Sequence, residues 1–128
     1  MVHHDIWDYD NTSAPQLTTI DHDGRRLDVV AMAGKTGYVY VFDRVTGEPI
    51  WPIEERPVPT KSEIPGELVS PTQPFPTNPP PFAKLSLTAA QVNPYIISPD
   101  TRTSYQQRVA AARYDGPFTP IAYEETLH

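Results

Sequence analysis

The sequence predicts a mainly β fold, in which one four-stranded antiparallel sheet is followed by a proline-rich loop and short helices. Four short extended runs follow one another at close spacing, and each is bounded by turn residues, as in an antiparallel meander. Eleven of the 16 prolines lie between Pro49 and Pro81, so the irregular part of the 128-residue chain is concentrated in one segment. A globular part therefore precedes a long irregular part.

The four runs are short, and each is bounded by turn residues. They are Gln16 to Ile20, Leu27 to Ala33, Tyr38 to Asp43, and Glu48 to Trp51. The first two runs are separated by a segment containing Asp23-Gly24, a pair that supplies the positive φ angle of a tight hairpin. Glycine-containing turns at residues 34–37 and 44–47 join the others. We expect the four runs to form one sheet.

The third run, residues 38–42, is apolar on both of its faces. A strand of this kind needs other layers on both sides of its sheet, which a lone four-stranded sheet cannot provide. Stacked blades of a β-propeller do provide them. Such repeats generally need at least about three copies for stability, and the sequence contains one. We therefore interpret the sheet as one propeller blade and expect the chain to be a piece of a larger protein.

The rest of the chain divides into two further parts. Proline removes a backbone donor and fixes its own φ, so residues 53–85 are predicted to be an extended loop after the blade segment 1–52. Residues 86–128 are predicted to form a helical insertion and a return strand. Its expected elements are a helix from Thr88 to Val92, a helix from Asp100 to Arg113 and extended chain from Tyr114 to Pro120.

Charge and cysteine content exclude several classes of function. The formal net charge is −6, and no cluster of Lys and Arg offers a binding surface for nucleic acid or an anionic membrane. The sequence has no cysteine, so disulfides, thiolate metal sites and cysteine nucleophiles are absent. It contains no run of 18 apolar residues and no basic, then apolar, amino-terminal signal segment.

The densest group of chemically versatile side chains is His3 to Asp10, with three carboxylates, two imidazoles and one indole. One interpretation is a solvated segment whose aspartates cap turns. A metal site built from His3 and His4 is disfavoured, because adjacent residues of an extended chain point to opposite faces. The other interpretation places an active-site carboxylate in this segment, and Asp8 is the candidate.

Lys35 is the second candidate, in the turn between the second and third runs. Residues 34–36 do not form a nucleotide-binding loop, since that motif requires a glycine at the position of Val29 and a following helix. In a meander, the entry to the first strand and the turn between strands two and three lie at the same end of the sheet. Asp8 and Lys35 should therefore meet there, either for proton transfer or as an ordinary ion pair of an exposed lysine.

Several segments in this order resemble the quinoprotein dehydrogenases, especially the membrane-bound glucose dehydrogenase branch. They are HHDIWDYD at residues 3–10, KTGYVYVFD at 35–43, EERPVP at 54–59, SPTQPFP at 70–76 and RYDGPFTP at 113–120. Residues 41–51 also resemble the tryptophan-docking motif by which blades of this family interlock. Val41 departs from that motif, which usually begins with the smaller alanine.

The resemblance implies a function for both candidates. Asp8 matches the catalytic base, and Lys35 matches the lysine that hydrogen-bonds the ring oxygens of pyrroloquinoline quinone (PQQ). The family also uses a divalent ion, commonly calcium or magnesium, whose ligands are expected in other blades. The implied substrate is a sugar or polyol, the implied electron acceptor is a respiratory quinone, and the implied location is the periplasm or the inner membrane. The isolated chain is expected to be inactive, because one blade cannot enclose the cofactor.

Two alternatives remain from the sequence. The chain could be a noncatalytic propeller-blade module that binds a partner chain through exposed strand edges, or an inactive truncated product. The dehydrogenase hypothesis requires the Asp8 carboxylate and the Lys35 amine to converge on one open site. The interaction-module hypothesis predicts nothing about their separation.

Overall fold

The structure is a computed structural model that describes residues 2–95, 98–123 and 126. The chain divides into two compact units. The first unit is Met1–Pro57 with Thr72–Ala83, and the second is Val58–Pro71 with Lys84–His128. Both candidate residues, Asp8 and Lys35, belong to the first unit.

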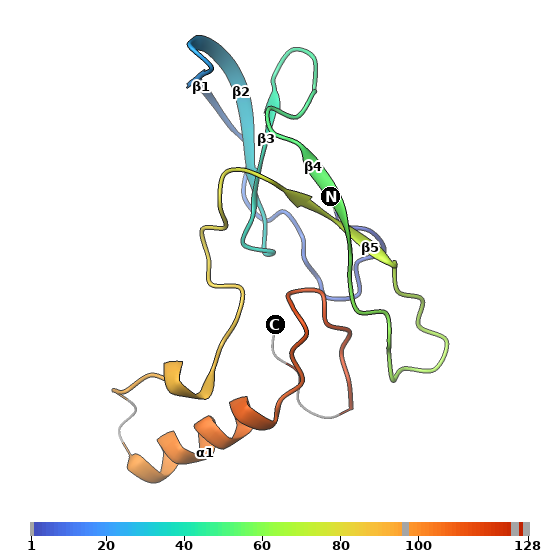
Figure 1. Cartoon of the computed structure of the whole chain (residues 1–128), viewed down its shortest axis with the longest axis vertical. Helices are drawn as coiled ribbons and strands as arrows, with labels where there is room; N and C mark the ends of the chain where they lie inside the picture. Colours follow the sequence, from blue (N-terminus) through green and yellow to red (C-terminus); the bar gives the residue numbers. More distant parts are fainter. Residues whose placement is uncertain (1, 96–97, 124–125, 127–128) are drawn as a thin grey trace. The chain divides into compact units, whose positions relative to one another are not determined.

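The first unit contains a three-stranded antiparallel sheet in the order β1-β2-β3 (Figure 1). Its strands are β1 (Gln16–His22), β2 (Arg25–Ala33) and β3 (Val39–Asp43). They confirm the first three predicted runs. The β1–β2 turn has φ values of 50° at Asp23 and 73° at Gly24. The Asp-Gly sequence predicted positive φ at this turn.

The prediction of one four-stranded sheet was wrong. The fourth run makes only an isolated bridge between Phe42 and Pro49, supported by hydrogen bonds from Ile50 N to Val41 O and from Asp43 N to Glu48 O. Pro49 has no N–H to extend the ladder. The next proline follows at once after Trp51 and restricts that residue's backbone. Pairing therefore stops after a single bridge.

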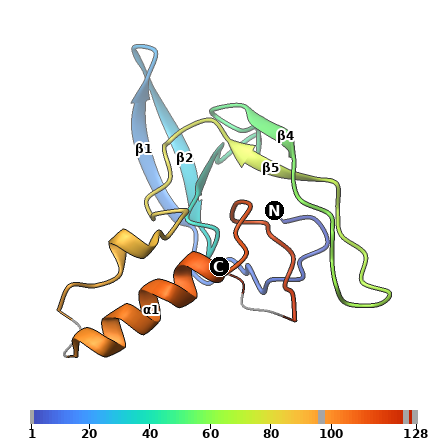
Figure 2. The same ribbon diagram turned by 60° about the horizontal axis from the view of Figure 1, so that its bottom comes forward.

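The proline-rich segment is not wholly a loop, which is a second correction. Residues Ile53–Pro57 form β4 and residues Thr72–Pro76 form β5, and the two pair antiparallel as a separate sheet (Figure 2). In a two-stranded sheet each strand has one unpaired edge, so a proline nitrogen can lie on that edge without breaking the ladder. Neither β4 nor β5 is a central strand, so the missing proline donors interrupt no ladder on a second side.

The core of the first unit gathers around β2 and β3. Val29 is fully buried, and the neighbouring residues Tyr40 and Val41, which point to opposite faces of β3, are 2% and 9% exposed. Both faces of β3 are therefore covered within the chain itself, whereas neighbouring blades were expected to provide the cover. β5 contributes part of the cover, since the rings of Tyr38 and Phe75 meet edge to face at 5.7 Å.

The described part of the second unit contains two short helices. A 3₁₀ turn, η1 (Ala89–Gln91), and α1 (Pro99–Ala111) lie close to the predicted helices and contact each other. Ser98 caps α1 through its hydroxyl, which accepts a hydrogen bond from Thr101 N. Residues 114–120, expected to be extended, instead form a turn in which Thr119 N donates to Gly116 O.

Candidate active site

Lys35 is held by a tight turn between β2 and β3. Gly34 N donates to Tyr38 O, and Gly37 N donates to Gly34 O, so the turn is closed by its own backbone. Thr36 is buried, whereas 38% of the Lys35 side chain is exposed. The turn therefore fixes the backbone of Lys35 while the ammonium group reaches the surface.

Asp8 lies in a loop that precedes β1 and is organised by Asp5. The Asp5 carboxylate accepts hydrogen bonds from Trp7 N at 3.0 Å and Tyr9 N at 2.7 Å. The Trp7 side chain is buried and its ring stacks on that of Tyr9. Asp8 adopts a left-handed φ of 63°, a conformation that aspartate tolerates better than most residues. The loop thus buries its indole and presents the Asp8 carboxylate to solvent.

The loop docks directly on the turn that carries Lys35. Lys35 N donates to Asp10 O at 3.4 Å. A Cβ at Gly34 would lie 2.6 Å from Asn11 Oδ1, so glycine allows the close approach of the two segments. Backbone contacts therefore bring the entry to β1 and the β2–β3 turn together, at the end of the sheet where the topology predicted that they would meet.

The two candidate side chains form a direct ion pair. Lys35 Nζ lies 2.7 Å from Asp8 Oδ2, and the Asp8 side chain is 77% exposed. The hydrogen bond from Lys35 lowers the pKa of the Asp8 carboxyl, and the same bond raises the pKa of Lys35. The nearby negative charges of Asp10 and Asp5 raise the Lys35 pKa further. At neutral pH the pair is a carboxylate beside an ammonium group, which is the state that a proton acceptor and a hydrogen-bond donor require.

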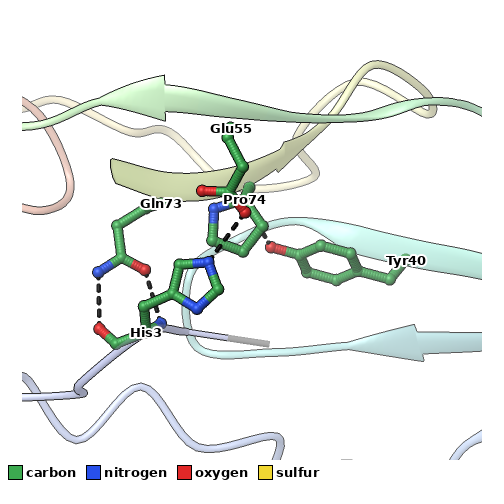
Figure 3. A network of polar contacts seen from close by, with 5 residues as sticks. All are labelled: His3, Tyr40, Glu55, Gln73 and Pro74. Carbon is green, nitrogen blue, oxygen red and sulfur yellow. Dashed lines mark hydrogen bonds and ion pairs between the residues drawn. The ribbon is translucent and has the colours of Figure 1, made fainter. Parts of the chain in front are cut away.

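A second polar network ties the start of the loop to β4 and β5 (Figure 3). The side-chain amide of Gln73 accepts a hydrogen bond from His3 N and donates one to His3 O, each at 2.8 Å. The His3 imidazole lies 2.8 Å from Glu55 Oε1. The buried Tyr40 hydroxyl donates to Pro74 O at 2.9 Å. Burial raises the pKa of Tyr40 to about 12, so the hydroxyl remains a donor.

Gln73 was missed as a site residue from the sequence. It lies in one of the quoted segments, residues 70–76, but its partner is 70 residues away along the chain. The available signal was a lone amide between Pro71 and Pro74. That signal does not identify a partner.

The described residues contain no group of three or more His, Asp or Glu side chains placed to hold a metal ion. His3 contacts Glu55, while His4 is exposed at a positive φ of 44°. Residues 2–95, 98–123 and 126 also contain no helix long and apolar enough to cross a membrane.

The first unit carries an exposed pair of a carboxylate and an ammonium group at the end of its three-stranded sheet. The sequence matches the family model described as "Glucose/ethanol/alcohol dehydrogenase, beta-propeller domain" over residues 1–128. The chain belongs to this family of PQQ-dependent dehydrogenases. No solved structure matches the chain significantly.

Several curated relatives match nearly the whole chain. The glycerol dehydrogenase large subunit of Gluconobacter oxydans (strain 621H) is 38% identical over 97% of the chain. The quinoprotein glucose dehydrogenase of Escherichia coli (strain K12) is 34% identical, and the quinate/shikimate dehydrogenase (quinone) of Acinetobacter baylyi is 33% identical, each over 98% of the chain. The chain spans only 17% of the length of the first of these relatives and 15% of the other two.

Membership of this family implies PQQ, and the residues present fit part of its site. Quinone oxygens accept hydrogen bonds and cannot donate them, so they require a donor from the protein. Lys35 has three N–H donors, and its partly exposed ammonium group can contact a further acceptor beside Asp8. The described residues do not fit a complete metal site, and we assign no metal ligand to them.

Proposed function

We propose that the chain supplies part of the active site of a PQQ-dependent dehydrogenase that oxidises a sugar or polyol. Asp8 is the base that accepts the hydroxyl proton of the substrate, and Lys35 donates hydrogen bonds to the quinone oxygens of PQQ. The observation that carries the proposal is the 2.7 Å contact between Lys35 Nζ and Asp8 Oδ2, on side chains that remain accessible.

The chemistry of the pair suits this division of labour. PQQ, when bound, accepts the hydride that leaves the substrate carbon. Asp8 must be ionised to take the hydroxyl proton, and the neighbouring Lys35 keeps its pKa low enough for that. Lys35 remains protonated because Asp8 raises its pKa, so it can donate to an acceptor oxygen.

The substrate class and the surroundings are proposed from the family. The relatives named above are dehydrogenases of glycerol, glucose and quinate or shikimate, which supports a polyhydroxylated substrate. A respiratory quinone is proposed as the final acceptor, and the periplasm or the periplasmic face of the inner membrane as the location. Ligands of the family's calcium or magnesium ion are proposed to lie in other blades, which would also exclude water from the site.

The test uses a protein that carries this chain within a complete set of blades and is loaded with PQQ and calcium. Asp8→Asn keeps the shape of the side chain but removes the base. We expect kcat with glucose, glycerol or quinate to fall at least about 10²-fold, within the range for loss of a general base, while the PQQ content is unchanged.

The matched control is Asp21→Asn, which neutralises an exposed carboxylate of β1 near the opposite end of the sheet. This variant should retain the parent kcat. Undiminished activity in Asp8→Asn, with Asp21→Asn as the baseline, would overturn the assignment of Asp8 as the base.

A further inference from the structure

The side chain of Gln73 is the most deeply buried polar group of the first unit. Its exposed fraction is 0%, and both ends of its amide are used on one residue of the loop that carries Asp8. Oε1 accepts from His3 N and Nε2 donates to His3 O, so the amide pairs with the backbone of His3 as a neighbouring strand would (Figure 3). A primary amide can do this because it combines a donor and an acceptor on one planar group.

The Gln73 amide, which clamps the backbone of His3, lies on a strand that is itself held in place. Gln73 belongs to β5, and the next residue, Pro74, accepts a hydrogen bond from the buried Tyr40 hydroxyl of β3. β5 is also paired along its length with β4. The position of the Gln73 amide is therefore fixed by both sheets of the first unit.

The loop is attached to the rest of the unit at its two ends, with Asp8 between them. At the start, His3 is clamped by Gln73. At the end, Asp10 O accepts from Lys35 N, in a contact of 3.4 Å that is long for a hydrogen bond. Together with the burial of Trp7, the attachment of His3 to Gln73 restricts the positions that the Asp8 carboxylate can reach.

We infer that Gln73 is a positioning residue for Asp8, and that its amide keeps the loop in the conformation in which the Asp8 carboxylate meets Lys35. The catalytic importance of this placement rests on the proposed function of Asp8. The placement itself does not, because it concerns only the geometry of the chain. The two claims can therefore fail separately.

The first experiment measures the pKa of the Asp8 carboxyl by NMR in the chain and in Gln73→Met. Methionine has a similar length but cannot pair with His3. The wild-type value lies below the ordinary 3.8 because of the bond from Lys35, and we expect it to rise toward 3.8 in Gln73→Met as that contact is lost. An unchanged pKa in a folded Gln73→Met chain would overturn the inference.

Tyr40→Phe is the matched control for general destabilisation. It removes a buried hydrogen bond to the same strand, at Pro74 O, without touching His3. It should lower the melting temperature and leave the Asp8 pKa at the wild-type value, because β5 is still held by its pairing with β4 and the Gln73–His3 hydrogen bonds remain. An Asp8 pKa that rises equally in Tyr40→Phe would show that any loosening of β5 has this effect, and would contradict a specific role for Gln73.

Gln73→Glu provides a rescue and keeps the test open if Gln73→Met does not fold. A protonated carboxyl can accept from His3 N and donate to His3 O, whereas a carboxylate cannot donate. Burial raises the pKa of a carboxyl, so the introduced group is protonated where Asp8 titrates, and the Asp8 pKa should stay at the wild-type value. At higher pH the clamp should open.

That opening is observed by hydrogen exchange of two backbone amides. Tyr9 N donates a hydrogen bond to the Asp5 carboxylate, and Lys35 N donates one to Asp10 O. In Gln73→Glu their protection should fall between about pH 5 and pH 8, the range to which burial moves a carboxyl pKa. The wild-type chain, with the same His3 and Glu55 groups beside the clamp, is measured at each pH as the reference. Equal protection of both chains at every pH would overturn the inference.

The proposed function is judged by a different measurement, the activity of Asp8→Asn. A shifted Asp8 pKa in Gln73→Met together with full activity of Asp8→Asn would leave the positioning role intact and refute the function. An unchanged pKa together with an inactive Asp8→Asn would do the reverse.

Discussion

At the scale of single residues, the candidate site depends on a few contacts between segments far apart in the sequence. Lys35 and Asp8 are 27 positions apart, and His3 and Gln73 are 70 positions apart. The first pair could be predicted because the order of strands in a meander decides which loops share an end of the sheet. The second could not, because the position of β5 depends on packing that no local pattern reports.

The Asp8–Lys35 pair should make the stability of the chain depend on pH. The folded pKa of Asp8 is lowered from 3.8, so its contribution to stability is complete above 3.8 and is lost as the pH falls through the folded value. Lys35→Met removes the donor and should remove this part of the acid sensitivity. Urea denaturation at pH 7 and pH 3 measures it: an equal loss of stability on acidification in both chains would contradict the pair.

The Asp43 side chain leads to a prediction about the turn after β3. Its carboxylate accepts from Thr46 N and Val45 N, and these two bonds lower its pKa. Asparagine keeps one acceptor oxygen, whereas alanine keeps none. Thermal denaturation at pH 7 should therefore give a lower melting temperature for Asp43→Ala than for Asp43→Asn. The opposite order would show that the turn does not depend on the acceptor.

At the scale of elements, local turn chemistry was a good guide and long-range pairing was not. The Asp23-Gly24 pair correctly predicted the β1–β2 hairpin, and the burial of both faces of β3 followed from its apolar sequence. The fourth run failed as a strand because the two prolines that flank its end limit pairing to one bridge. The β4–β5 pair was missed because its strands are separated by residues 58–71 and are rich in proline.

The hairpin turn gives the prediction at this scale. Gly24 has a φ of 73° and no neighbouring atom within 4 Å of an added Cβ, so an alanine there meets only backbone strain. Gly24→Ala should therefore lower the free energy of unfolding by about 1 kcal/mol, the usual cost of a left-handed alanine, and Gly24→Asn should cost less. Urea denaturation decides between this and a neutral effect, which would contradict the assigned turn.

At the scale of the whole molecule, the candidate site belongs to one of the two compact units. The first unit contains Asp8, Lys35 and Gln73, together with both sheets. The second has its own buried residues, Phe118 and Thr119, and the described part of α1 buries no residue. The chain covers 17% of the length of the first relative, and its candidate site is open to solvent at the Asp8 carboxylate.

This openness leads to a prediction about activity. The isolated chain, supplied with PQQ, calcium and glucose, glycerol or quinate, should show no dehydrogenase turnover, because the Asp8 side chain is 77% exposed and water reaches its carboxylate. Reduction of an electron-accepting dye is the measurement, with the complete-blade protein as the positive control. Turnover by the isolated chain would show that the other blades are not needed for the chemistry.

The most direct test of the central claim is an equilibrium titration of the purified chain with PQQ in the presence of calcium, followed by cofactor absorbance. The chain, Lys35→Ala and the control Lys84→Ala, which removes an exposed lysine of the second unit, are compared. We predict that Lys35→Ala weakens PQQ binding at least about tenfold, which corresponds to ~1.4 kcal/mol, and that Lys84→Ala binds like the parent chain. Equal affinities of the parent and Lys35→Ala would contradict the claim that Lys35 is a PQQ contact.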